Sequence, residues 1–182
     1  EAGGSWAANV YTSAKAGAWT VTGSYTGIIG TASLTVSAGL LHHIVISPDV
    51  STIAAGDTQA YTAEAFDQFE NSLGDVTALT NFTILELGHG GTWAANVYTS
   101  KKAGTWTVSG NHNGRFDTAL LTVTKAPAQY IVISPSAATI TAGNSIPYTA
   151  EAFDVGENSL GDVTSSTAFS IPPEAGGYWT AN

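Results

Sequence analysis

The sequence contains no cysteine and no methionine, and lysine and arginine together number only 5. Without cysteine, no disulfide can hold the chain together, so a hydrophobic core must stabilise it. No run of about 18 apolar residues occurs, and we therefore expect no membrane-spanning segment. The formal net charge of −9 argues against nucleic acid as a partner, because an acidic chain repels phosphate backbones.

The residues that are present favour an all-β fold. Hydrophobic residues make up 43% of the chain and charged residues only 10%, which excludes a disordered chain of low hydrophobicity and high charge. Threonine, serine, valine and aromatic residues are plentiful, and the 20 glycines fit turns between short strands. An acidic, threonine-rich chain without cysteine is also more typical of a prokaryotic surface protein than of an animal secreted one.

The chain repeats itself with a period of about 87 residues. The eight residues from Trp6 recur from Trp93, 87 residues later, and a truncated copy containing Trp179 ends the sequence. The segment 61–67 recurs unchanged at 148–154. One period is long enough to enclose its own core, since domains of roughly 60 residues can fold alone. Each unit is therefore interpreted as a domain in a tandem array.

Within a unit, the apolar residues alternate with polar ones. Trp19 and Val21 alternate with threonines, and so do Leu34 and Val36. Alternation with a period of two indicates strands with one face on a core and the other in water. The turn signals separate about seven short strands in each complete unit. The sequence therefore predicts tandem, immunoglobulin-like antiparallel β-sandwiches of about 87 residues per repeat.

The repeats are out of phase with the sequence as it stands. We expect residues 1–37 to be the C-terminal strands of one repeat, 42–126 a complete repeat, and 130–182 the N-terminal part of a further repeat. The short joints 37–43 and 125–129 would limit bending. The favoured interpretation is a segment excerpted from a longer array, because exposed half-cores are costly. The alternative is that a neighbouring chain supplies the missing strands.

Several motifs of the complete repeat carry a resemblance to a known group. They are Ile-Ser-Pro at 46–48, Ala-Gly at 55–56, Tyr-Thr-Ala-Glu-Ala-Phe-Asp at 61–67, Glu-Asn-Ser-Leu-Gly-Asp-Val-Thr at 70–77, Ala-Gly-Thr-Trp-Thr-Val at 103–108 and Leu-Thr-Val at 121–123. The pattern resembles the bacterial and archaeal Ig-like repeats of large cell-surface proteins, which include the invasin and intimin stalk domains. The resemblance implies an extracellular setting as a stalk, adhesin shaft, S-layer module or fibre unit.

Two sets of residues are candidates for a metal site. The carboxylates of the turns are weak calcium candidates: Asp67, Glu70, Asp75, Asp154, Glu157 and Asp162. Their spacing does not match an EF-hand loop, and we favour turn capping by Asp67 with solvated neighbours. The adjacent His42 and His43 lie on a probable strand, where their side chains would point to opposite faces, so no metal site and no cofactor is predicted.

No residue pattern supports catalysis. The sequence has no nucleophile-elbow motif and no serine, histidine and aspartate arrangement that could be argued as a triad. The repeated unit duplicates its acidic positions, which suits a structural module better than a single active site. We therefore expect a protein that is not an enzyme.

Three tryptophans and one asparagine are candidates for other contacts. Trp6, Trp93 and Trp179 begin strands after glycine-rich turns, and they could serve assembly or stack on a sugar, although core packing is the default. Asn81 heads a glycosylation sequon that the next repeat lacks, because Ala168 stands there.

The sequence favours a structural repeat unit of an extracellular stalk or filament, which gives length and stiffness and whose partners are copies of itself. Assembly by intermolecular strand pairing is the finer version of this hypothesis. The alternative is a carbohydrate- or cell-binding adhesin module that contacts cell-surface glycans through exposed aromatic residues. Burial of Trp93 and Tyr98 distinguishes the two, because buried rings are not available to a sugar.

Overall fold

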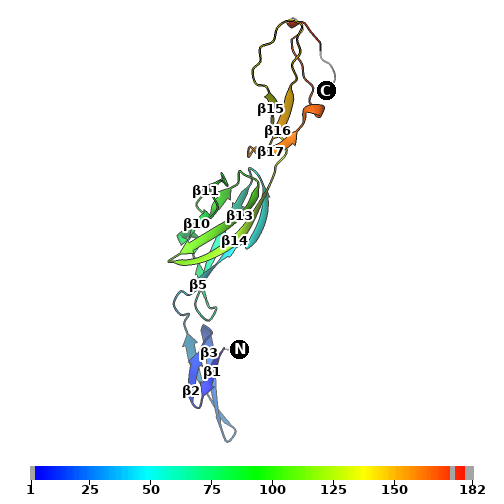
Figure 1. The fold of residues 1–182 in the computed structure, drawn as a ribbon. Coiled ribbons are helices and arrows are strands. Elements are labelled where there is room, and N and C mark those ends of the chain that lie inside the picture. The colour runs from blue at the N-terminus through cyan, green and yellow to red at the C-terminus, as the bar shows by residue number, and fades with distance from the viewer. Residues whose placement is uncertain (1–2, 173–174, 179–182) are drawn as a thin grey trace.

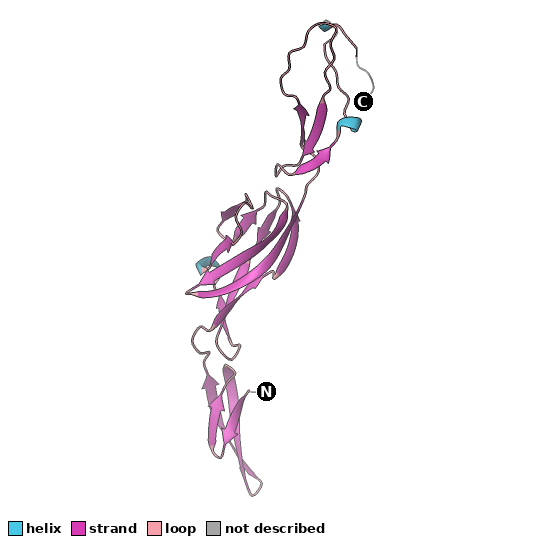
Figure 2. Cartoon of the chain, in the orientation of Figure 1, coloured by secondary structure: helices cyan, strands magenta, loops and turns pink. Residues whose placement is uncertain are grey.

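The computed structural model describes residues 3–172 and 175–178. Strands account for 52% of the chain and helices for 4%, which confirms the predicted all-β class. Figures 1 and 2 show an elongated molecule with a central sandwich and a smaller group of strands at each end. Among the described residues, no helix is long and apolar enough to cross a membrane.

Four strands form the N-terminal group. They are β1 (Gly4–Ala7), β2 (Val10–Ser13), β3 (Gly17–Tyr25) and β4 (Ile28–Val36). β1 pairs with β2 and β3 with β4, both antiparallel. The turn between β3 and β4 places Thr26 and Gly27 at φ values of 46° and 84°. Two successive residues with positive φ are the requirement of the tight hairpin turn that matches strand twist.

The central sandwich contains ten strands. They are β5 (His43–Ser47), β6 (Val50–Ala54), β7 (Thr58–Ala60), β8 (Thr62–Phe66), β9 (Ser72–Asp75), β10 (Asn81–Ile84), β11 (Thr92–Ala94), β12 (Val97–Thr99), β13 (Gly104–His112) and β14 (Arg115–Thr124), with a short 3-10 helix η1 (Thr77–Leu79). The sheets have the orders β10-β13-β14-β6, β11-β12-β7 and β5-β8-β9.

One pairing in the sandwich differs from the antiparallel pattern that the sequence predicts. β6 runs parallel to β14, with Val50 opposite Leu120 and Ile53 opposite Val123. The chain turns at Pro48 after β5 and enters the other sheet at its edge. There it lies beside a strand that runs in the same direction, whereas the other described pairings are antiparallel.

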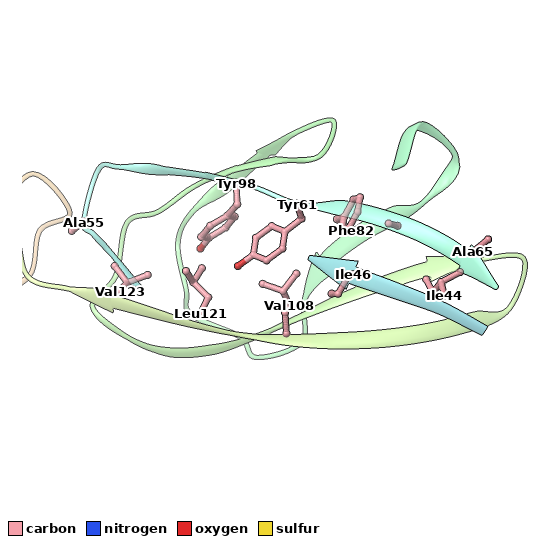
Figure 3. Close-up of a cluster of buried hydrophobic side chains, with 12 residues drawn as sticks. Ile44, Ile46, Ala55, Tyr61, Ala65, Phe82, Tyr98, Val108, Leu121 and Val123 are labelled. Carbon is pink, nitrogen blue, oxygen red and sulfur yellow. The ribbon is translucent and has the colours of Figure 1, made fainter. Parts of the chain in front are cut away.

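The core lies between the sheets, as Figure 3 shows. Its buried members are Ile44, Ile46, Ala55, Tyr61, Ala63, Ala65, Phe82, Tyr98, Val108, Ala119, Leu121 and Val123. Alternate residues of β8 and β14 contribute, as the period of two predicts. The hydroxyl of Tyr61 lies 3.1 Å from the Ser51 hydroxyl, and that of Tyr98 lies 2.9 Å from His89 Nδ1. Both buried phenols therefore have polar partners.

The C-terminal group repeats one sheet of the sandwich. Strands β15 (Tyr130–Ser134), β16 (Thr149–Phe153) and β17 (Ser159–Asp162) pair in the order β15-β16-β17, and η2 (Thr164–Ser166) follows. They correspond to β5, β8, β9 and η1, each 87 residues earlier. Even the irregularity of pairing is repeated, since register shifts occur at Ala65/Phe66 and at Ala152/Phe153.

Candidate functional site: the joints between domains

Two joints connect the three groups of strands. Each joint contains a loop, a linker and a turn, and these segments correspond between the two joints. The first joint comprises the loop 14–16, the linker 37–42 and the turn 67–71, and the second joint comprises 101–103, 124–129 and 154–158. The turn follows the strand β8 or β16. In the first joint Glu70 N donates to Asp67 O at 3.2 Å, and Glu70 has a φ of 63°. Glu157 repeats this conformation with a φ of 59°.

Asp67 holds the linker of the first joint against the turn. Its side chain is buried, and Oδ1 accepts hydrogen bonds from Phe69 N at 2.8 Å and Asn71 N at 3.0 Å. Oδ2 accepts a hydrogen bond from Gly39 N at 2.7 Å. The carboxylate therefore shapes its own turn and fixes the entering chain at the same time.

Asn71 extends from this turn to the N-terminal group of strands. Its Oδ1 accepts a hydrogen bond from Ala16 N at 2.7 Å, and its Nδ2 donates to Ala14 O at 2.8 Å. The same Nδ2 donates to Asp67 Oδ2 at 2.9 Å. One amide side chain thus binds two main-chain groups of the N-terminal group of strands. We call the Asp67–Asn71 pair, and its counterpart Asp154–Asn158, the clasp.

The second joint repeats the clasp. Asp154 is buried, and its Oδ2 accepts a hydrogen bond from Ala126 N at 2.9 Å. Asn158 Oδ1 accepts from Ala103 N at 2.9 Å, and Asn158 Nδ2 donates to Lys101 O at 3.0 Å. Each of these residues lies 87 positions after its counterpart in the first joint. The joint is therefore part of the repeat, and both joints have the same construction.

The aspartates of the clasp are ionised at neutral pH. Burial disfavours the charge of Asp67, but hydrogen bonds from Asn71, Gly39 and Phe69 outweigh burial and hold its pKa well below the ordinary value. The same balance lowers the pKa of Asp154, where Asn158, Ala126 and Gly156 are the donors. Hydrogen bonds to an ionised acceptor are stronger than those between neutral groups, so the charge strengthens the clasp.

The charged residues around the two clasps differ. In the second joint, Glu157 Oε2 lies 3.0 Å from Lys101 Nζ and 3.8 Å from Lys102 Nζ, and Lys102 Nζ also donates to Glu157 O at 2.9 Å. In the first joint, Glu70 Oε2 lies 3.4 Å from His43 Nε2. The position of Lys101 is occupied there by Ala14.

The calcium candidates serve the turns and joints. Asp75 Oδ1 accepts a hydrogen bond from Thr77 N at 2.7 Å, and Asp162 Oδ1 accepts from Thr164 N at 2.8 Å. Hydrogen bonds from the threonine side chain and main chain lower the pKa of both aspartates. Among the described residues, no three histidine, aspartate or glutamate side chains gather into a group that could hold a metal ion.

The aromatic candidates lie in different surroundings. Trp93 packs against the core, with ring centroids 5.1 Å from Tyr98, 5.9 Å from Phe82 and 6.0 Å from Tyr61, and Tyr98 is fully buried. Trp6 is 57% exposed and packs on Tyr11 at 5.1 Å. Trp179 lies outside the described residues. Because the rings of Trp93 and Tyr98 face the core, they are not available to a sugar.

Asn81 is exposed at the start of β10. Two histidines have polar contacts within the sandwich, since His89 contacts Tyr98 and His112 Nδ1 lies 3.3 Å from Leu79 O. Sequence reasoning did not identify Asn71 and Asn158 as joint residues. The available signal was their recurrence next to the acidic positions of the turn, within Glu-Asn-Ser.

No family model matches the sequence, and no curated protein matches it. Among solved structures, the chain is similar to domains 1–6 of the surface layer protein SbsC, with 18% identity and a TM-score of 0.38 over 85% of this chain and 22% of that one. It is similar to SbsC domains 4 and 5, with 16% identity and a TM-score of 0.40 over 63% of this chain and 69% of that one. It is also similar to FdeC, an Escherichia coli adhesin, with 19% identity and a TM-score of 0.45 over 80% of this chain and 53% of that one. These scores are too low to assign a function to the chain.

Proposed function

We propose that the chain is a structural repeat unit of an extracellular stalk or filament at the cell surface, and that it provides length and stiffness. The observation that carries this proposal is the clasp, which joins successive domains in the same way at both joints. A catalytic role would need one specialised site, whereas the described acidic residues of the joints occur in matched copies and accept hydrogen bonds from the main chain.

The clasp resists bending because it connects three segments on two domains. Asn71 binds Ala14 and Ala16 of the preceding domain, while Asp67 binds Gly39 of the linker. A bend at the joint would separate Asn71 from the loop and break its hydrogen bonds to Ala14 and Ala16. At about 0.5–1.5 kcal/mol for each neutral hydrogen bond, the two contacts of the asparagine contribute about 1–3 kcal/mol to the straight form.

Small-angle X-ray scattering of the 182-residue chain and of the double variant Asn71→Ala/Asn158→Ala tests the proposal. At concentrations low enough for a monomer, we expect the parent chain to scatter as a stiff rod. The variant should show a smaller maximum dimension and a distribution of bent shapes. Asn144→Ala is the matched control, because Asn144 is exposed in the segment between β15 and β16. Equal flexibility of the parent chain and the double variant would contradict a stiffening role.

A further inference from the structure

Two adjacent histidines at the first joint bring their ring nitrogens together. His42 Nδ1 lies 3.4 Å from His43 Nδ1, and the two rings are nearly perpendicular, with centroids 5.6 Å apart. The sequence predicted that these side chains point to opposite faces of one strand. The structure differs because β5 begins at His43, so His42 belongs to the linker and does not follow the alternation of the strand. Since the nitrogens are much closer than the ring centres, both Nδ1 atoms lie between the rings.

The main chain and a neighbouring ring hold both histidines in this arrangement. The main-chain N–H of His42 donates to Phe66 O at 2.8 Å, and the His43 ring stacks on the Phe66 ring with centroids 5.3 Å apart. The His43 side chain is nevertheless 30% exposed, and His42 is exposed. The pair is therefore positioned by the sandwich and is still accessible to small solutes.

The separation of the two nitrogens matches a zinc site. Two imidazole nitrogens bound to one tetrahedral Zn²⁺, each at about 2.0–2.1 Å, lie about 3.3–3.4 Å from each other. A direct hydrogen bond between the rings fits less well, because bonds from N–H donors are usually about 2.7–3.2 Å long. Imidazole suits zinc and related transition metals, whereas Ca²⁺ and Mg²⁺ prefer oxygen ligands. Distance and ligand type therefore both indicate zinc.

Glu70 supplies the outer partner that a metal-bound histidine usually has. Its Oε2 lies 3.4 Å from Nε2 of His43, which is the ring nitrogen that does not face His42. Metal-binding histidines commonly donate their second ring N–H to a carboxylate, which fixes the tautomer and makes the ring a better ligand. When Nε2 carries the proton toward Glu70, Nδ1 of His43 has a free lone pair for a metal ion.

The second joint shows that the repeat does not require these histidines for packing. Gln129 and Tyr130 occupy the two positions there, and the Tyr130 ring stacks on Phe153 with centroids 5.4 Å apart. The corresponding carboxylate, Glu157, pairs with lysines instead. Another aromatic ring therefore satisfies the same packing, and the first joint differs by adding two metal ligands and a carboxylate beside them.

We propose that His42 and His43 bind one Zn²⁺ ion through their Nδ1 atoms, with Glu70 as the outer hydrogen-bond partner of His43. Two protein ligands leave the remaining positions of the tetrahedron to water, so the ion exchanges more readily than one in a closed structural site. A site with two ligands agrees with the finding that no group of three metal-binding side chains occurs among the described residues. Zinc binding at this joint is independent of the proposed stalk role.

Isothermal titration calorimetry of the chelator-treated 182-residue chain with zinc chloride tests the site. We expect one ion per chain, and excess Mg²⁺ should not displace it, because Mg²⁺ competes for carboxylates but not for imidazole. Glu70→Gln should weaken binding about tenfold, as loss of an outer partner does, and His42→Gln or His43→Tyr should weaken it further. The two histidine variants should fold, because glutamine and tyrosine stand at these positions in the second joint.

NMR signals of the imidazole rings distinguish this site from general binding of zinc to an acidic surface. Zinc should shift or broaden the ring signals of His42 and His43. It should leave those of His89 and His112 unchanged, because both have polar contacts within the sandwich. Unaltered zinc affinity in both histidine variants would overturn the proposal. So would displacement of zinc by Mg²⁺, or ring signals of the parent chain that do not respond to zinc. None of these outcomes bears on the stiffness measured by scattering.

Discussion

The two joints share a clasp but differ in what surrounds it. Asp67 and Asn71 bind the same three main-chain positions that Asp154 and Asn158 bind 87 residues later. Around them, the second joint has ion pairs to Glu157, and its Gly156 packs against Lys101. The hydrogen bonds from the clasp to the main chain are therefore the same in both joints. What differs between the joints is the set of side chains around the clasp.

The largest effect should come from pH, because it acts on both clasps together. The pKa of each clasp aspartate is lowered in the folded chain, below the value of about 3.9 in an unfolded chain. The stability that these charges contribute is therefore complete above about pH 4 and is lost as the pH falls through the lower, folded pKa. Scattering at pH 7, 4 and 2.5 should show both joints loosening only in the most acidic sample. A double Asp67→Asn/Asp154→Asn variant should lose most of this dependence, and loosening that is already complete at pH 6 would contradict it.

A smaller effect should distinguish the two joints at one position of the turn, which is Gly156 in the second joint and Phe69 in the first. Gly156 lies against the preceding domain, and a Cβ there would lie within 2 Å of Lys101 O, whereas the first joint has the half-exposed Phe69 at this position. Gly156→Ala should weaken the second joint by about 1–3 kcal/mol, since the loop must move. Hydrogen exchange at Ala103 N, which donates to Asn158, measures the opening.

Phe69→Ala is the matched control for Gly156→Ala. It should leave exchange at Ala16 N nearly unchanged, because the Phe69 side chain is half-exposed while its main-chain N–H still binds Asp67. Equal effects of the two substitutions would show that the joints are packed alike at this position.

The smallest effect should come from the exposed ion pairs of the second joint. Glu157→Gln removes the charge that faces Lys101 and Lys102, but exposed pairs contribute little. We expect less than about a fivefold increase in exchange at Ala103 N, and the difference should vanish in high salt. Glu70→Gln should leave exchange at Ala16 N unaltered, because Glu70 pairs with His43 of its own sandwich and not with the loop 14–16. If Glu157→Gln raised exchange at Ala103 N equally at low and high salt, the carboxylate would act through packing instead of charge.

The local alternation of apolar and polar residues predicted the strands, and the recurrence of whole segments predicted the repeat. The alternation of Val108 and Trp106 with polar residues marks β13, and the identity of 61–67 with 148–154 marks corresponding strands. The parallel pairing of β6 with β14 was not predictable, because it depends on which sheet edge the chain meets after Pro48. The turn at Asp67 could be anticipated from its residue types. Its contact with Gly39, and that of Asn71 with Ala16 55 residues away, could not.

The clasp also bears on how an array of such domains changes over generations. Asn71 and Asn158 form their hydrogen bonds to the preceding loop with main-chain atoms, and the residues there differ between the joints, with Ala14 in one and Lys101 in the other. A repeat therefore makes few demands on the side chains of its neighbour. Recombination that inserts or deletes one whole period would restore a working joint at the new boundary. The length of the proposed stalk would then vary among descendants without compensating substitutions.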